Sequence, residues 1–308
     1  LPDTEAVLMV DASNAFNRLN RTVALQNTLR ICPSIAPALI NCYRNDAHLF
    51  VGGEVISSSE GTTQGDPLAM AMFATATIPL IHQLKESSSA NQVWFADDAT
   101  AGGKLQSLKQ WWDELERRGP DFGYYANAAK SWLIVKEQHM TEANNIFDNT
   151  GVQITKDGRR NLGAALGTQS FTEKYVAKQV QKWVEEVKQL ATIAESQPHA
   201  AYAALTHGLI GRWSYLSQTV CNISDLLQPL EDAIRHHLIP ALTGRAGITD
   251  LERELLALPT RSGGLGIPNP AKTSHKKFMN SERISARLMA LILQQETVYP
   301  ANVAIEQA

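Results

Sequence analysis

The chain has 308 residues, of which 44% are hydrophobic and 19% are charged, so it holds ample apolar material for a folded core. A net charge of −3 and a pI near 6.3 argue against a protein that binds nucleic acid over its whole surface, so any such binding must depend on local positive charge. Three cysteines without CxxC spacing argue against a disulfide framework or a zinc knuckle, and they favour a reducing, intracellular compartment, cytoplasmic or nuclear.

The first predicted element is a strand over residues 6–10, whose continuous apolar run is typical of a strand buried on both faces. It ends at Asp11. Residues 20–45 then have a helical pattern, with Asn20 as a plausible N-cap. The apolar positions of this segment are Val23, Leu25, Leu29 and Ile31.

Residues 48–59 predict a hairpin that turns at Gly52-Gly53. Asp66-Pro67 begins the next helix, with a capping carboxylate and a proline at the first helical position. The apolar run 68–81 contains about 14 residues, whereas a membrane span needs about 20, so it predicts a buried core helix.

A second pair of strands is expected around Asp97-Asp98, with 93–96 before this tight turn and 99–101 after it. Residues 105–118 have the pattern of an amphipathic helix. Further strands are expected at 131–135 and 152–155.

Asp157-Gly158 is a predicted hairpin turn. From Phe171 onward the pattern is helical, which places a boundary near 171. Thr249 begins a capping box, and helix is interrupted again at 258–270. One face of the first long helix is apolar, at Val176, Val180, Trp183, Val187 and Leu190.

Three acidic residues stand at predicted strand ends in an otherwise apolar setting: Asp11, Asp97 and Asp98. Carboxylates placed side by side raise one another's pKa unless a cation neutralises them. Mg²⁺ prefers oxygen ligands, and two such ions about 3.5–4 Å apart stabilise the attacking and leaving oxygens of a phosphoryl displacement. If the strands are neighbours, these residues predict a two-metal site. Taken alone, an Asp-Asp pair on a turn is more often a solvated hairpin tip.

Five short motifs favour the metal site because of the order in which they occur. They are Val10-Asp11-Ala12-Ser13-Asn14-Ala15-Phe16, Gln64-Gly65-Asp66-Pro67, Phe95-Ala96-Asp97-Asp98, Phe122-Gly123-Tyr124-Tyr125-Ala126-Asn127 with Lys130, and Leu162-Gly163 before Gly167. In this order and spacing they resemble the palm motifs and the primer-grip hairpin of reverse transcriptases. Residues 258–267 are similar to a stretch that follows the thumb in retroelements lacking long terminal repeats, so the resemblance is greatest to that type.

The resemblance implies an α+β fold: a polymerase palm, with an antiparallel sheet backed by helices as in an RRM, partial fingers and a C-terminal helical thumb. It places the palm at 1–170 with a fingers insertion at 20–63, the thumb at 171–257 and a C-terminal extension at 258–308. Most of the family's fingers precede the first motif, and the chain opens at Leu1 without an initiator Met. We therefore expect a piece of a longer polypeptide that has weak or no activity by itself.

The resemblance also implies roles for the charged residues. Asp11 and Asp97 are the expected main ligands of two Mg²⁺ ions, with Mn²⁺ as an alternative. Asp98 is the supporting ligand, since adjacent strand residues point to opposite faces. Lys130 is expected to protonate the departing pyrophosphate or to stabilise its charge. The alternative is that Lys130 is a solvated surface residue, as a lone lysine usually is.

Phe16 is expected under the sugar of the incoming nucleotide, where a bulky ring leaves no space for a 2′-hydroxyl and so selects deoxynucleotides. RNA-templated RNA polymerases carry a polar or acidic group near that place, so Phe16 argues against that class. Its alternative role is that of a core residue at a helix start. Gln64 is expected to touch the nucleotide or the template base, and Gly65 to let the backbone come close.

Leu162 and Gly163 form the expected primer grip. Lys174, Lys178 and Lys182 recur every four residues on the first thumb helix, a spacing suited to a line of phosphates. The alternative for them is ion pairing, because an acidic residue, Glu186, lies four residues after Lys182. The implied partners are an RNA template, a DNA primer and dNTPs, without a membrane; protein partners are not indicated.

The expected function is therefore that of an RNA-directed DNA polymerase fragment that transfers dNTPs to a primer 3′-hydroxyl. The alternative is a catalytically inactive or domesticated copy that keeps the fold and acts as an RNA- or protein-binding module.

Overall fold

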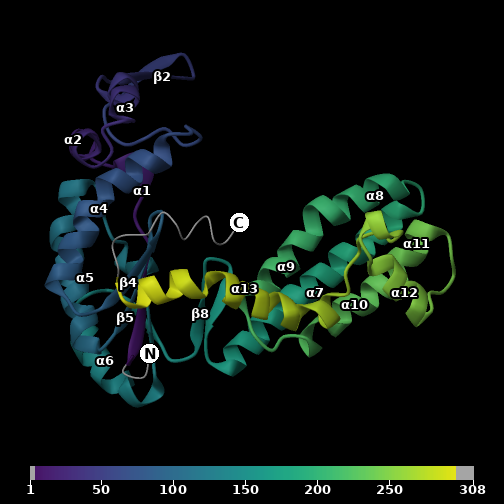
Figure 1. Ribbon diagram of the computed structural model, residues 1–308. Helices are drawn as coiled ribbons and strands as arrows, with labels where there is room; N and C mark the ends of the chain where they lie inside the picture. The colour runs from purple at the N-terminus through teal and green to yellow at the C-terminus, as the bar shows by residue number, and fades with distance from the viewer. Residues whose placement is uncertain (1–3, 296–308) are drawn as a thin grey trace. The chain divides into compact units, whose positions relative to one another are not determined.

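The computed structural model of the protein describes residues 4–295, and this part of the chain falls into two compact units (Figure 1). Residues 4–156 and 291–295 form the first, here named the sheet unit. Residues 157–290 form the second, the helical unit. The division lies upstream of the boundary near 171 that the sequence predicts, because a hairpin following residue 156 packs with the helices.

A five-stranded sheet is the centre of the sheet unit, with the strand order β4-β5-β1-β6-β7. All neighbouring strands are antiparallel except β6 and β7, which run parallel. One face of β1 is fully buried and the other is half-buried, which agrees with its continuous apolar sequence. The strands are β1 (Ala6–Val10), β4 (Asn91–Phe95), β5 (Asp98–Gly103), β6 (Trp132–Val135) and β7 (Gln153–Thr155).

Three helices cover one face of this sheet in Figure 1: α4 (Ala69–Ser87), α5 (Leu105–Phe122) and α6 (Met140–Phe147). Their apolar side chains and those of the strands form one core, which contains the fully buried Trp111 and Trp112. The predicted core helix over 68–81 is confirmed, since α4 buries residues along most of its length. Among the helices of residues 4–295, none is long and apolar enough to cross a membrane.

The predicted helical segment 20–45 is two helices, α2 (Arg21–Ile31) and α3 (Ala36–Tyr43), with a break between them. Asn20 caps the first helix as predicted, because its side-chain oxygen accepts from the backbone N–H of Val23 at 3.2 Å. The break contains Pro33, which disfavours helical backbone at the preceding Cys32, where φ is −139° and ψ is 69°.

The expected apolar face of α2 is wrong in part. Leu29 and Ile31 are 52% and 39% exposed, while the helix buries its small and polar positions instead. The hydroxyl of Thr28 lies 2.7 Å from that of Thr75 on α4, so small side chains let the two helices approach closely. The buried positions of α2 are Arg21, Ala24 and Thr28.

The hairpin predicted at 48–59 is confirmed as β2 (Ala47–Val51) and β3 (Glu54–Ser58). Gly52 and Gly53 form its turn, with φ angles of 59° and 87° that only glycine adopts without strain. Almost every side chain of the two strands is exposed, including Phe50 at 79%.

The hairpin turn predicted at Asp157-Gly158 is wrong. The strand β7 before it pairs in parallel with β6, and Gly158 instead begins a new hairpin of β8 (Gly158–Asn161) with β9 (Ala164–Gly167). That hairpin turns at Leu162-Gly163, where both residues have positive φ. The sequence pattern could not decide which of two nearby turns closes a hairpin, because the pairing partner of a strand is set by the tertiary structure.

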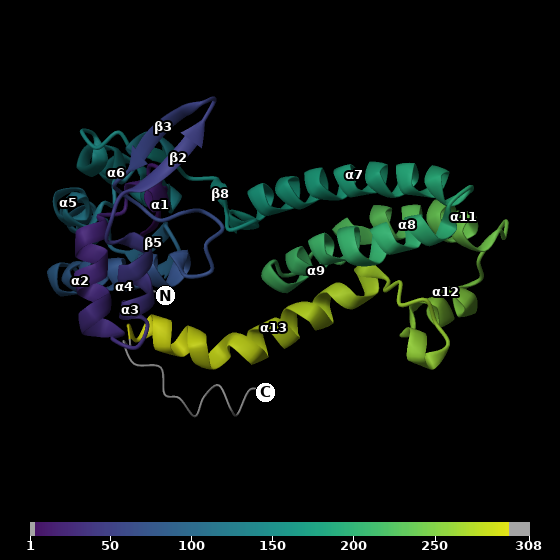
Figure 2. The same ribbon diagram turned by 90° about the horizontal axis from the view of Figure 1, so that it is seen from above.

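The helical unit consists of this hairpin and a set of packed helices. Figure 2 shows the long helix α7 running alongside α8 and α9, and the rings of Trp183 and Trp213 meet edge to face at 6.2 Å between α7 and α9. The five apolar residues predicted on one face of α7 are all buried. The helices are α7 (Gln169–Ala194), α8 (Pro198–Ala204), α9 (Ile210–Thr219), α10 (Gln228–Ala233), α11 (Ile239–Thr243), α12 (Asp250–Ala257) and α13 (Pro270–Leu293), with π-helical turns η3 (Leu205–Leu209) and η5 (Ile234–Leu238).

A buried ion pair connects two of these helices. Arg253 of α12 donates to both carboxylate oxygens of Glu231 of α10 at 2.7 Å, and each side chain is 4% exposed. The guanidinium also donates to the carbonyl of Ile267 at 2.8 Å, so the pair holds the segment after α12 in place. Thr249 begins α12 with the capping box that the sequence predicts.

Glu231→Gln is expected to destabilise the helical unit by about 3–5 kcal/mol, because removing one member of a buried pair leaves the other charge uncompensated. Urea unfolding followed by circular dichroism measures the loss. Glu254→Gln is the matched control, since it breaks an exposed pair with Lys272 that is worth about 0–1 kcal/mol. Equally small losses from both variants would contradict the role assigned to the buried pair.

Candidate active site

The register of the sheet brings Asp11 to the turn between β4 and β5. Val10 pairs with Ala99, so the next residue of β1 lies opposite the start of β5, where Asp98 pairs with Phe95 across the hairpin. The two-residue turn is Ala96-Asp97, one residue before the predicted turn at Asp97-Asp98, because Phe95 pairs with Asp98 and Asp98 already belongs to β5. Residues far apart in the sequence therefore meet at one end of the sheet.

The charges at this end of the sheet influence one another. The pKa of Asp98 is raised, first by partial burial of its carboxyl group and then by the negative charges of Asp97 and Asp11. The buried hydroxyl of Tyr124 also has a raised pKa, because of its burial and then because of the same three carboxylates. The three acids thus share one electrostatic environment.

The turn that carries Asp97 is held in an unusual conformation. Ala96 has φ +55°, the left-handed region that residues with a Cβ adopt at a cost of about 1–2 kcal/mol. The hydroxyl of Tyr124 donates to the backbone carbonyl of Asp97 at 2.9 Å and so fixes the turn. Such strain persists only where neighbouring contacts hold it.

Asp11 is fixed through its backbone while its carboxylate stays accessible. Its carbonyl accepts from the N–H of Asn127 at 2.8 Å, and its N–H donates to the hydroxyl of Ser131 at 3.3 Å. The ammonium of Lys130 lies 3.9 Å from the carboxylate, and the two side chains are 70% and 44% exposed respectively. Lys130 therefore places a positive charge beside one of the three acids of the candidate site.

The donor set suits a hard divalent cation, because all three acids offer carboxylate oxygens and their mutual repulsion disfavours the fully charged state. The oxygens are not gathered into a closed cage, however. Over the described residues, no group of three or more acidic, histidine or cysteine side chains is posed as a metal site. Carboxylates that repel one another separate unless a cation lies between them, so the shared environment and the open arrangement are compatible.

Phe16 lies on the short helix α1 (Ala15–Arg18), which follows Asp11. Its ring is half-buried and stacks on Phe73 of α4, with centroids 4.7 Å apart. The ring is therefore part of the core on one side, as its alternative role predicts, while the rest of its surface remains partly exposed.

Gln64 and Gly65 lie in the segment before α4, and both are exposed. Gly65 has φ +93° and open space around the position of a Cβ. Asp66 caps the turn that leads into α4: its carboxylate accepts from the N–H of Leu68 at 2.8 Å, and α4 itself begins at Ala69. The hydroxyl of Tyr43 donates to the same carboxylate, and this bond is the main reason that the pKa of Asp66 is lowered.

Arg21 is a functional candidate that the sequence analysis missed. It is 8% exposed and donates to the carbonyls of Ser58 and Glu60, both at 2.8 Å, and of Gly61 at 3.1 Å. Among the ion pairs of residues 4–295 it has no acidic partner. This buried arginine, which also donates to the hydroxyl of Ser58 at 3.4 Å, fixes the backbone that leads to Gln64. The one available signal was a charged residue spaced three and seven positions before the buried Ala24 and Thr28.

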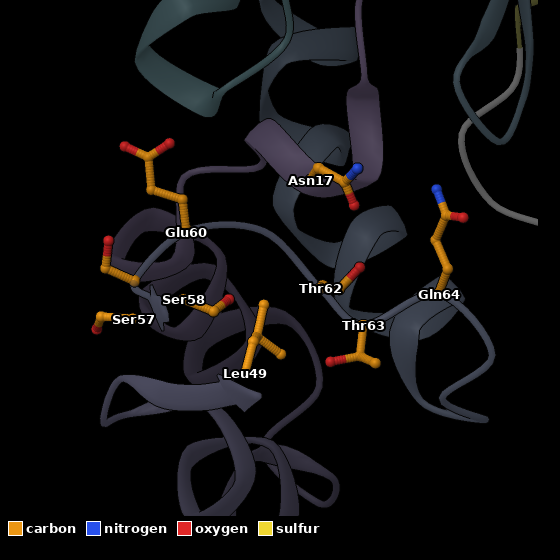
Figure 3. Close-up of a pocket in the computed structure, with 9 residues that line it drawn as sticks. Asn17, Leu49, Ser57, Ser58, Glu60, Thr62, Thr63 and Gln64 are labelled. Carbon is orange, nitrogen blue, oxygen red and sulfur yellow. The ribbon is translucent and has the colours of Figure 1, made fainter. Parts of the chain in front are cut away.

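A cavity of about 520 Å³ lies beside this segment (Figure 3). Its lining side chains come from α1, from the β2–β3 hairpin and from the segment that follows the hairpin. They are Asn17, Leu49, Ser57, Ser58, Ser59, Glu60, Thr62, Thr63 and Gln64. The predicted substrate residue Gln64 thus borders a cavity rich in hydroxyl groups.

In the helical unit, two tyrosines hold the Leu162-Gly163 turn. Tyr175 of α7 donates to the carbonyl of Gly163 at 2.8 Å, and Tyr215 of α9 donates to that of Leu162. The side chain of Leu162 remains 47% exposed. The turn expected as a primer grip is therefore rigidly presented by two helices.

The three lysines expected to bind phosphates are exposed along α7. Lys182 lies 3.9 Å from Glu186, so ion pairing, the alternative that we considered, is present at this position. Lys182 also borders a cavity of about 700 Å³ together with Arg160 and Arg212. Lys174 and Lys178 do not border that cavity.

No family model matches the sequence, and no curated protein matches it. Among the solved structures that are similar over most of the chain are two telomerases. Telomerase from Candida albicans in complex with a TWJ fragment of telomeric RNA has 10% identity and a TM-score of 0.40, covering 96% of this chain and 50% of that one. Apo telomerase from Candida tropicalis has 11% identity and a TM-score of 0.42, covering 99% and 53%. This chain therefore spans about half the length of each. The TM-scores are too low for a conclusion about the function of this chain to rest on the similarity.

Asp98→Asn is expected to raise the melting temperature at neutral pH. A raised pKa means that the folded state binds the proton more tightly than the unfolded state, so stability falls as pH rises through the ordinary Asp range to the raised value. The gain in melting temperature disappears at pH values below the ordinary pKa of Asp, where residue 98 of the wild type is protonated in both the folded and the unfolded state.

Melting curves in a metal-free buffer, from about pH 3 to about pH 8, measure this difference. Asp113→Asn is the matched control, because its carboxylate is stabilised by Lys109 at 2.7 Å and its removal should give no gain. A gain from Asp98→Asn that is equal at every pH would show that repulsion between the acids is not its cause.

Proposed function

We propose that this chain carries the nucleotidyl-transfer centre of a reverse transcriptase, which extends a DNA primer with dNTPs along an RNA template. The observation that carries the proposal is that the sheet brings Asp11 to the same end as Asp97, in the turn before β5, and Asp98, the first residue of β5. The order of the sequence motifs adds to it and favours a retroelement lacking long terminal repeats.

In this proposal Asp11 and Asp97 hold two Mg²⁺ ions, or Mn²⁺, with Asp98 in support. The ions supply stabilisation of the attacking and leaving oxygens of the phosphoryl transfer. The strained turn at Ala96 and the hydrogen bond from Tyr124 fix the backbone that carries the Asp97 carboxylate. A fixed backbone lowers the reorganisation needed during the reaction.

Lys130 neutralises part of the negative charge at the site, since its ammonium lies 3.9 Å from Asp11. In the proposal it donates a proton to the departing pyrophosphate or stabilises its charge. Its high exposure leaves the side chain free to reach a bound triphosphate.

Phe16 follows Asp11 on α1 and is supported from behind by Phe73. A ring held by stacking cannot move aside easily, so it excludes a 2′-hydroxyl better than a mobile one. Gln64 and Gly65 are proposed to contact the nucleotide or the template base, on a segment whose backbone Arg21 fixes.

Duplex binding is proposed for the helical unit. Leu162 and Gly163 would contact the primer, and the cations around the cavity of that unit would contact phosphates. Those cations are Arg160, Lys182 and Arg212, with Lys174 and Lys178 further along α7. Glu186 binds both Lys182 and Arg212, so phosphates compete with it for two of them.

Asp97→Asn is expected to lower primer extension with dNTPs and Mg²⁺ by about a hundredfold or more, as the loss of one group that stabilises transition-state charge commonly does. Extension of a labelled DNA primer on an RNA template measures the effect, with Asp113→Asn as a control that should extend normally. Measurable extension by the wild type that is equalled by Asp97→Asn would show that the catalytic assignment is wrong.

Mg²⁺ titration by calorimetry gives a readout that does not require turnover. The wild type should bind Mg²⁺, and Asp97→Asn should bind it more weakly, because one carboxylate is lost. If the wild type binds no Mg²⁺ at millimolar concentration yet still binds RNA, the alternative of an inactive binding module is supported instead.

Phe16→Val is expected to let ribonucleotides in, since it removes the ring proposed to exclude the 2′-hydroxyl. The measurement is the ratio of extension with rNTPs to extension with dNTPs, which should rise about tenfold or more. Phe50→Val, at an exposed phenylalanine of the β2–β3 hairpin, is the matched control. An unchanged ratio in Phe16→Val would remove the argument for a DNA-synthesising enzyme.

A further inference from the structure

The cavity beside the β2–β3 hairpin, here named the hydroxyl cavity, has a lining that selects against phosphates and apolar ligands. Six of its nine lining residues carry hydroxyl or amide groups from Ser, Thr and Asn, and Gln64 adds another amide. Leu49 is its one apolar member, and Glu60 its one charged member. No cation borders it, so a neutral ligand that both donates and accepts hydrogen bonds suits it best.

Thr62 gives a second and independent indication of a ligand. It is 4% exposed, and its hydroxyl has no hydrogen-bond partner among the described residues. The other three buried threonines all donate to backbone carbonyls: Thr28 to Ala24, Thr75 to Ala71 and Thr77 to Phe73. An unsatisfied buried hydroxyl is costly, and in the wall of a polar cavity it indicates a group that is supplied from outside.

The wall that carries Thr62 is built rigidly. Arg21 fixes the carbonyls of residues 58, 60 and 61, and the N–H of Thr62 donates to the carbonyl of Phe16 at 2.8 Å. Gly61 packs so closely on Asn17 that a Cβ would lie 2.4 Å from its backbone oxygen. A backbone fixed at this many points is in place before binding, so only side-chain rotations have to be ordered when a ligand binds.

We infer that the hydroxyl cavity takes a ribose of the RNA template strand and that Thr62 hydrogen-bonds its 2′-hydroxyl. This rests on the proposed function. The 2′-hydroxyl is both donor and acceptor, and it is the group by which a protein distinguishes RNA from DNA. Rotation about the Cα–Cβ bond of Thr62 directs its hydroxyl to the sugar, and Gln64 at the border of the cavity lies beside the attached base.

The test uses primer–template duplexes of one sequence, whose template strand is RNA, DNA, or RNA with single 2′-deoxy substitutions. Fluorescence anisotropy gives their affinity for the wild type, for Thr62→Val and for Thr77→Val. Thr77 is the matched control because it is equally buried in the same unit but its hydroxyl is bonded. Melting temperatures are measured for all three proteins.

The wild type should lose about three- to tenfold in affinity when one particular template position is made 2′-deoxy, as expected for a single neutral hydrogen bond. Thr62→Val should show the same loss on all-RNA template and no further loss from the deoxy substitution. Its melting temperature should not fall, since the lost hydroxyl had no partner. Thr77→Val should melt earlier and keep the preference for RNA.

Three outcomes separate this inference from the proposed function. If primers are extended but every deoxy substitution acts equally on the wild type and Thr62→Val, the inference is overturned and the polymerase stands. If Thr62→Val removes the preference for an RNA template but the wild type extends no primer, the cavity assignment is supported and the catalytic proposal is not. If the wild type binds neither duplex, both are overturned.

Discussion

The antiparallel pairing of β1 with β5 is the contact on which the candidate site depends. It sets Asp11 opposite the start of β5, and the tight turn before β5 then brings Asp97 and Asp98 to the same place. Hydrogen bonds of the sheet thereby hold together charges that repel, and this repulsion adds to partial burial, the larger cause, in raising the pKa of Asp98. The neighbouring Lys130 and the bond from Tyr124 offset part of that cost.

The two polar regions of the sheet unit, the carboxylates and the hydroxyl cavity, differ in the charge of their side chains. At the carboxylates, charge is concentrated and the backbone is strained at Ala96, an arrangement that favours a cation. At the hydroxyl cavity, the buried Arg21 donates to three backbone carbonyls and to the hydroxyl of Ser58, and the lining beyond it is almost uncharged. One site is thus suited to ionic ligands and the other to neutral hydroxyls.

The helical unit explains how a chain of net charge −3 can still offer positive charge. Arg160, Lys182 and Arg212 border one cavity, beside a turn that Tyr175 and Tyr215 hold by its carbonyls. Because electrostatic attraction is screened within about 10 Å at ordinary ionic strength, such a local group acts largely independently of the acidic residues elsewhere.

The sequence by itself determined the elements with strong local signals: the strand before Asp11, the glycine turn at Gly52-Gly53, the caps at Asn20 and Thr249, and the apolar face of α7. It also singled out Asp11, Asp97 and Asp98 as candidates, because residue types and their order along the chain can be read from the sequence. Only the tertiary structure decided which face of α2 is buried, which turn closes the hairpin after β7, and that Arg21 and Thr62 matter. Those depend on partners distant in the chain, and neither periodicity nor propensity carries information about what a side chain will meet once strands and helices have packed.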